Sequence, residues 1–92
     1  MPVLNYTHLD ALGTTVIQAA QPVVLAVVTI NTRGTAPNLL TLYDGPDATA
    51  PVIAIIDTSV SIGTLLYEVN TNTGLTAVLA GGGAADVTIG WG

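Results

Sequence analysis

The stretch Thr64–Asn70, TLLYEVN, shows the pattern that decides the fold class. In an extended strand, successive side chains point to opposite faces of the sheet, so residues two apart share a face. Leu65, Tyr67 and Val69 would then form one apolar face, with Glu68 on the opposite face. This period of two predicts a half-buried β-strand rather than a helix.

The same alternation recurs outward from this stretch, most clearly in Asp86–Trp91, DVTIGW, where Val87, Ile89 and Trp91 share a face. Val, Ile, Thr and Leu are frequent, and Gly and Pro interrupt the chain at short intervals, which is typical of an all-β domain. We predict strands over Val3–Thr7, Thr14–Ala20, Val23–Thr32, Asn38–Tyr43, Val52–Asp57, Thr64–Val69, Leu75–Ala80 and Asp86–Trp91.

The 92 residues predict a single domain spanning 1–92, because the chain is short and shows neither a linker nor an internal repeat. The expected fold is all-β: an antiparallel β-sandwich of about seven to eight short strands, jelly-roll or immunoglobulin-like, with a closed barrel as the alternative. The glycine-rich stretch Ala80–Ala85, AGGGAA, is expected to be a flexible connection between strands.

Two predicted strands depart from the alternation, because Val23–Ile30, VVLAVVTI, and Val52–Ile56, VIAII, are apolar on both faces. One face of an antiparallel sheet normally meets solvent, so the outer faces of these strands need a cover. A loop or the N-terminal segment of the same chain is one candidate cover. A neighbouring subunit is the other, and it predicts an interface that includes Val24, Ala26 and Val28.

The composition excludes several classes of partner. Charged residues make up 8% of the chain, against ~25% in an average soluble domain. Arg33 is the single Lys or Arg, and the net charge is -5, which opposes binding to nucleic acid or anionic membranes. The longest apolar run, Val23–Val28, is far shorter than the ~20 residues of a membrane-spanning helix. The start of the chain also lacks the basic and apolar regions of a secretory signal.

The stretch Leu42–Pro51, LYDGPDATAP, places Asp44 and Asp47 around a Gly-Pro pair. Asp accepts hydrogen bonds from the nearby backbone, Gly adopts positive φ and Pro presets φ, so the favoured interpretation is a turn between two strands. The spacing does not match an EF-hand loop, which ends in a bidentate Glu. A weak Ca²⁺ site formed by the two aspartates remains the alternative.

The residues show no pattern typical of an enzyme, and we expect neither a cofactor nor a catalytic residue. His8 is the single histidine and there is no cysteine, which argues against a zinc site. Ser59 and Ser61 are the serines of the chain, and neither lies in a nucleophile-elbow sequence. The glycines at Gly81–Gly83 lack the Lys-Ser/Thr of a phosphate-binding loop.

The sequence from Asn38 to Trp91 resembles small all-β structural proteins of tailed bacteriophages. The similarity rests on a strand that ends in Tyr43-Asp44-Gly45, an apolar strand at Ile53–Asp57, the hairpin at Tyr67–Leu75 and a final strand at Ala85–Trp91. The resemblance implies a virion protein assembled in the bacterial cytoplasm, either a decoration or cement protein of the capsid or a small head or tail accessory. It also implies binding to the major capsid protein or another virion protein, and a homo-oligomer, for which a trimer is the expected form.

The expected interface of such a subunit comprises Val24, Ala26, Val28, Tyr43 and Trp91. Trp91 has two possible roles, because it could complete the core in step with Val87 and Ile89 or project as an interface anchor. The alternative function is a carbohydrate- or receptor-binding module of a head or tail fibre. That function would require exposed aromatic side chains, and the candidates are Tyr6, Tyr43, Tyr67 and Trp91.

Overall fold

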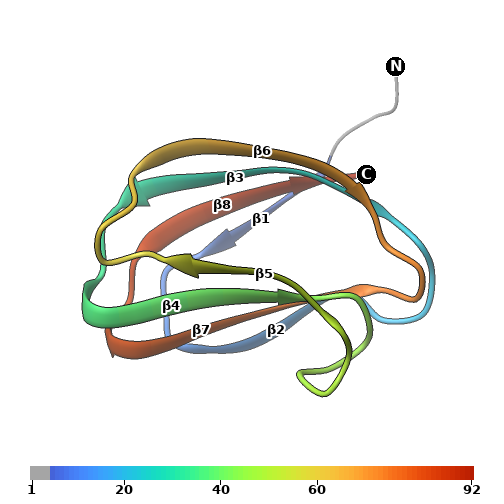
Figure 1. Ribbon diagram of the computed structural model, residues 1–92, viewed down its shortest axis with the longest axis horizontal. Helices are drawn as coiled ribbons and strands as arrows, with labels where there is room; N and C mark the ends of the chain where they lie inside the picture. The colour runs from blue at the N-terminus through green and yellow to red at the C-terminus, as the bar shows by residue number, and fades with distance from the viewer. Residues whose placement is uncertain (1–4) are drawn as a thin grey trace.

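The computed structural model describes residues 5–92, which form eight strands in two four-stranded antiparallel sheets (Figure 1). The two sheets face each other as the layers of a β-sandwich, and the described residues contain no helix. The predicted all-β sandwich is therefore confirmed, and the closed barrel is wrong. The strands are β1 (Asn5–Leu9), β2 (Gly13–Gln18), β3 (Val24–Thr32), β4 (Thr35–Tyr43), β5 (Val52–Asp57), β6 (Gly63–Asn70), β7 (Leu75–Gly83) and β8 (Asp86–Trp91).

The order of the strands is that of a jelly roll. One sheet is β1-β8-β3-β6 and the other is β2-β7-β4-β5. The first strand pairs with the last, β2 with β7, β3 with β6 and β4 with β5, so the chain resembles one long hairpin wound on itself. This is the double-sheet arrangement of eight strands that defines jelly rolls. The immunoglobulin-like alternative is wrong, since that fold distributes its strands differently between the sheets.

Most predicted strand positions agree with the structure, and β5 and β8 agree at both ends. The first predicted strand began at Val3, which lies outside the described residues; β1 itself begins at Asn5. The largest difference is at Gly81–Gly83, where the sequence predicted a flexible connection. These glycines instead extend β7 and pair with the first half of β4.

The glycines of β7 are required by the close approach of β4. A Cβ atom at Gly81 would collide with the carbonyl oxygen of Pro37, and the backbone there has φ +116°. A Cβ at Gly82 would lie 2.8 Å from the carbonyl oxygen of Thr35. Close packing of two backbones, rather than flexibility, therefore accounts for the consecutive glycines.

The core lies between the sheets and consists of aliphatic side chains that alternate along the strands. In β7 and β8, the inward residues Leu75, Leu79, Val87 and Ile89 are all at most 1% exposed. Trp91 continues the inward row of β8 and packs against this core, where its Nε1 donates a hydrogen bond to Thr7 Oγ1 at 3.1 Å. The core-closing role predicted for Trp91 is therefore confirmed.

A β-bulge changes which residues of the apolar strand β3 point into the core. The register against β8 shifts between Leu25 and Val27, so Ala26 is an extra residue and the alternation changes phase there. Leu25, Val28 and Ile30 consequently all point into the core, each at most 1% exposed. The sequence-based assignment of Val28 to an outer interface is wrong, because it assumed uninterrupted alternation.

A buried polar cluster joins β4 to the segments that follow β5 and β7. Asn38 is completely buried, and its Nδ2 donates to the carbonyl oxygen of Ala80 at 3.2 Å. Its Oδ1 accepts from Thr58 Oγ1 at 2.6 Å and from the backbone N–H of Ala85 at 3.2 Å. A buried polar side chain is tolerated when its hydrogen bonds are made, as they are here.

We expect Asn38→Ala to lower the free energy of unfolding by about 2–4 kcal/mol, because it leaves the N–H of Ala85 and the Thr58 hydroxyl without this acceptor. Urea denaturation at neutral pH measures the change. The matched control is Asn70→Ala, which removes an exposed asparagine at the end of β6 and should cost no more than about 0.5 kcal/mol. Equal losses in the two variants would show that the buried cluster has no special role.

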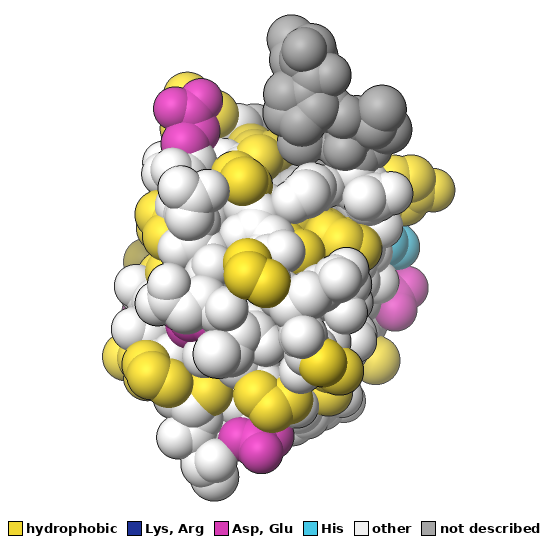
Figure 2. Space-filling model, turned by 90° about the vertical axis from the view of Figure 1, so that its right-hand side faces the viewer, with side chains coloured by type: hydrophobic (Ala, Val, Ile, Leu, Met, Phe, Trp, Pro, Cys, Tyr) yellow, Lys and Arg dark blue, Asp and Glu magenta, His cyan; other side chains and the backbone are white. Residues whose placement is uncertain are grey.

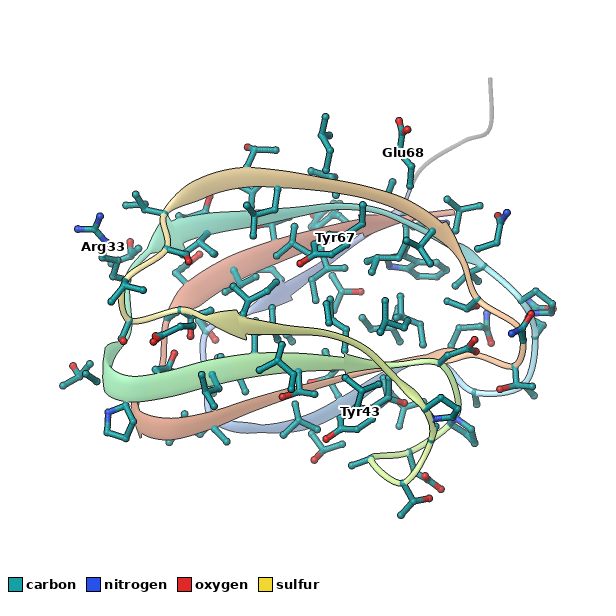
Figure 3. The ribbon with its side chains drawn as sticks, in the orientation of Figure 1. Arg33, Tyr43, Tyr67 and Glu68 are labelled. Carbon is teal, nitrogen blue, oxygen red and sulfur yellow. The ribbon has the colours of Figure 1, made fainter. Side chains whose placement is uncertain are left out.

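Strand β6 contains one residue with an unfavourable backbone conformation. Glu68 has φ +51°, in the left-handed region that glycine adopts most readily. It lies where the β3–β6 register shifts, so that β6 has one residue more than β3 between the pairs Leu25–Val69 and Val27–Leu66. The Glu68 side chain points away from the sandwich into solvent (Figure 3).

Replacing Glu68 with glycine should therefore stabilise the protein by up to about 1 kcal/mol, because it relieves the left-handed strain. Leu66→Gly is the control, since Leu66 is also exposed on β6 but does not have positive φ. That control should be destabilised by about 0.5–1 kcal/mol. Chemical denaturation of both variants is the measurement. A loss of stability in Glu68→Gly comparable to that of the control would contradict the expected strain relief.

Candidate functional site

The residues expected at an interface do not form one surface. Val28 lies in the core and Trp91 packs against it. Val24 and Ala26 are half-buried in β3. Tyr43 is half-buried at the end of β4, and it points away from the opposite sheet (Figure 3). Of the five residues, Tyr43 therefore lies on a different sheet from the other four.

The outer side of the β2-β7-β4-β5 sheet carries several exposed apolar side chains. Because Leu40 and Leu42 point inward, their neighbours on β4 point outward. The cross-strand register places these outward residues in rows with those of β2, β7 and β5. We call this surface the apolar face, and its larger apolar members are Val16, Leu39, Tyr43, Val52, Ile55 and Val78.

Several of these side chains are exposed to an unusual degree. Ile55 is 63% exposed and Val52 is 52% exposed, both on the edge strand β5, while Val16 and Leu39 are 48% and 42% exposed. Asp57 is the acidic residue in the outward rows of this sheet, at the end of β5. Large exposed apolar areas typically mark sites of protein interaction.

Positive charge is scarce over the described surface. Arg33 lies at the far left end of the sandwich in Figure 3, where its Nε donates to the carbonyl oxygen of Val60 at 3.1 Å. The opposite end, seen in Figure 2, has scattered hydrophobic and acidic side chains and displays no Lys or Arg among the described residues. The surface is thus suited to apolar contact more than to charge pairing.

The Asp44–Pro51 segment forms a turn whose acidic side chains are held by nearby donors. The Asp47 carboxylate accepts the backbone N–H of Thr49 at 2.9 Å, as expected of an Asp that shapes its own turn. The Asp44 carboxylate accepts the backbone N–H groups of Asn72 at 2.9 Å and Thr73 at 3.0 Å. Asp44 therefore fastens the β4–β5 loop to the β6–β7 turn, and the turn interpretation is confirmed for this segment.

These hydrogen bonds predict a specific pH dependence. The N–H of Thr73 is the main donor that lowers the pKa of Asp44, with further donors around it. A carboxyl whose pKa is lower in the folded state adds stability above its unfolded pKa of about 3.9 and loses that contribution as the pH falls. We expect Asp44→Asn to have a lower melting temperature than the wild type at pH 7, with a gap that narrows below about pH 4.

Thermal unfolding of both proteins between neutral and acid pH provides the measurement, and the ¹³C shift of the Asp44 carboxyl follows its titration directly. A gap in melting temperature that stays constant over this range would contradict a role for the ionised Asp44 carboxylate.

A second group of polar side chains lies on the other sheet, where β1 meets β8. His8, Asp10 and Asp86 each offer a ligand atom suited to a metal ion, and these atoms all lie within 4.8 Å of one another. His8 Nε2 lies 2.8 Å from Asp86 Oδ1, and this hydrogen bond raises the pKa of His8. Hydrogen bonds from Asn31 and from His8 lower the pKa of Asp86.

Sequence reasoning did not bring these three residues together. His8 and Asp10 are two apart, a spacing that puts side chains on one face of an extended chain. Asp86 starts the last strand, and nothing in the sequence alone shows that the last strand pairs with the first. The topology supplies that contact, since Leu9 pairs with Val87 in the β1–β8 ladder.

Comparisons with known proteins found no match for this chain among family models, curated proteins or solved structures. The resemblance to bacteriophage proteins therefore remains a prediction from the sequence motifs. Within the described residues there is also no helix with the length and apolarity needed to cross a membrane.

Proposed function

We propose that this protein is a non-enzymatic structural subunit of a tailed-bacteriophage virion, most specifically a capsid decoration or cement protein. In this proposal it self-associates through the apolar face and binds across the seams between copies of the major capsid protein. The observation on which the proposal rests is the apolar face itself, with Val16, Leu39, Val52 and Ile55 all more than 40% exposed.

The physical properties of the chain support an assembly role. A domain of 92 residues buries a limited core, and this one contains no cysteine for a disulfide. Covering the apolar face with another subunit would add buried area and stabilise the fold through association. Many copies on one particle would act together, so weak contacts for each copy would suffice to hold neighbouring coat subunits.

The fold is compatible with this proposal but does not decide it. Jelly rolls occur in viral capsid proteins and also in lectins, so the analogy at the level of fold supports both candidate functions. The motifs at Tyr43-Asp44-Gly45 and Ala85–Trp91 favour the virion protein.

The positions of the aromatic side chains weigh against the carbohydrate-binding alternative. Tyr67 is half-buried between the sheets and Trp91 packs against the core. Tyr6 is 75% exposed on β1, whereas Tyr43 faces outward on β4, in the other sheet. The exposed aromatic side chains thus do not share a surface on which one sugar could stack.

The placement of Ser59 supports a non-enzymatic role. The Ser59 hydroxyl donates to Asp57 in the loop after β5, whereas His8 pairs with Asp86 at the β1–β8 ladder. A nucleophilic serine would need a histidine within hydrogen-bond reach as its base. Ser59 and His8 are instead engaged with different carboxylates.

Self-association can be tested by light scattering behind a sizing column. We expect the wild type to have a mass that is a defined multiple of 9.3 kDa, with a trimer as the expected form. Ile55→Asp should reduce this mass to that of the monomer, because association would bury an unpaired charge on the apolar face. Leu66→Asp is the matched control, since Leu66 is 76% exposed on the outer side of the other sheet, and it should keep the wild-type mass.

A wild type that stays monomeric across micromolar to millimolar concentrations would contradict self-association through this face, as would an unchanged mass in Ile55→Asp.

The virion assignment has its own test. Electron cryo-microscopy of particles from a phage that encodes the chain should show it on the outer capsid surface, and its absence from those particles would overturn the assignment.

A further inference from the structure

We propose that His8, Asp10 and Asp86 form a binding site for a divalent transition-metal ion, with Zn²⁺ as the reference ion, that ties the first strand of the domain to the last. The site lies on the β1-β8-β3-β6 sheet, so it is separate from the apolar face and independent of the proposed assembly role.

The geometry fits a small metal ion. Two ligands of one tetrahedral Zn²⁺ lie about 3.4 Å apart when the metal–ligand distances are about 2.1 Å. The ligand atoms of His8, Asp10 and Asp86 already lie within 4.8 Å of one another, and His8 Nε2 is 2.8 Å from Asp86 Oδ1. An ion could therefore enter by replacing the proton between His8 and Asp86 as these two side chains move slightly apart, with a small rotation of the exposed Asp10 side chain.

The ligand types select the class of metal. Imidazole nitrogen favours Zn²⁺, Cu²⁺ and Ni²⁺, whereas Ca²⁺ and Mg²⁺ prefer sites built from oxygen atoms alone. One imidazole with two carboxylates is a mixed nitrogen and oxygen set that carries a charge of −2 when ionised, which compensates the charge of a divalent ion. This composition separates the site from the Asp44–Asp47 loop, where both carboxylates are engaged by backbone N–H groups.

Asn31, which is not itself a ligand, holds the Asp86 carboxylate in place. Asn31 Nδ2 donates to Asp86 Oδ1 at 2.9 Å and also lies 3.1 Å from Thr88 Oγ1, on the neighbouring strand. Side chains that orient metal-ligating carboxylates in this way often contribute substantially to metal affinity. Asn31 is therefore assigned as a positioning residue on β3, opposite the start of β8.

The surface beside the cluster has room for the remaining ligands. Residues 8–15, which include His8 and Asp10 and lead into β2, line an open hollow of about 200 Å³. Figure 2 shows the histidine and a nearby acidic side chain exposed at one edge of the molecule. Three protein ligands and one water from this hollow would complete a four-coordinate site.

The proposed ion would cross-link β1 to β8. Strand β1 is an edge strand that is bonded only to β8 within the described sheet. An ion shared by His8 and Asp10 at the end of β1 and by Asp86 at the start of β8 would fix that edge. Small domains commonly gain stability from a metal or a disulfide, and this chain has no cysteine.

The test uses tag-free full-length protein that has been treated with EDTA and dialysed. Calorimetric titration with ZnCl₂ should show one ion bound per chain, and the melting temperature should rise with Zn²⁺ concentration but not with Ca²⁺ or Mg²⁺. His8→Asn and Asp86→Asn should each weaken Zn²⁺ binding by at least about tenfold, and Asn31→Ala by about tenfold. Asp47→Asn, a remote aspartate, is the matched control and should bind like the wild type.

Nuclear magnetic resonance adds a readout specific to the site. The protein has a single histidine, so its imidazole signals belong to His8 and should shift on addition of Zn²⁺. The exposed positions of His8 and Asp86 allow each variant to be checked for native folding by circular dichroism before titration. Absence of binding at millimolar Zn²⁺, unchanged affinity in His8→Asn and Asp86→Asn, or His8 signals that do not move would each overturn the proposal.

Discussion

Aliphatic side chains from both sheets meet in one shared layer, and their burial is the interaction on which the rest of the structure depends. Leu25, Leu40, Leu42 and Leu75 are completely buried there. Because strand side chains alternate, each residue that points into this layer has neighbours in the chain that point outward. The composition of the outer surfaces is thus a consequence of how the core is built, and the scarcity of charged residues leaves parts of those surfaces apolar.

Polar groups inside this fold are placed where the sheets must be joined at their ends. Asn38 and Thr58 connect the end of β5 to β4, and Thr71 joins the β6–β7 turn to Val23 through both its hydroxyl and its backbone. Among the described residues, no buried side-chain nitrogen or oxygen lacks a hydrogen-bond partner. The few buried polar side chains therefore specify which loops meet, while the aliphatic layer supplies most of the stability.

Much of this fold could be predicted from the sequence, because the alternation in TLLYEVN and DVTIGW reports directly which side chains point inward. Two features could not be predicted. The bulge at Ala26 changes the phase of β3 and moves Val28 into the core, and no local residue pattern marks it. The glycines of β7 have the sequence pattern of a flexible connection, and their close approach to Pro37 depends on a strand far away in the sequence.

The candidate sites also differ in whether they depend on neighbouring residues or on residues far apart in the sequence. The turn at Asp44 and Asp47 follows from local residue preferences, and the sequence indicated it. The apolar face was predicted only in part, because the expected interface was centred on β3, while Tyr43 and the two-faced apolar stretch Val52–Ile56 lie on the opposite sheet. The grouping of His8 and Asp10 with Asp86 depends on the pairing of the first and last strands, which a single sequence does not reveal.

The jelly-roll order also constrains how the chain can fold during synthesis. In both sheets, a strand from the end of the chain, β7 or β8, lies between strands from its first half. While the ribosome is still making these two strands, β1 and β2 have no partner and the inner edges of β3 and β4 are open. Neither sheet can be completed until β7 and β8 have been made. Nascent chains crowded on one messenger would therefore expose unpaired apolar edges to each other, a situation that favours aggregation.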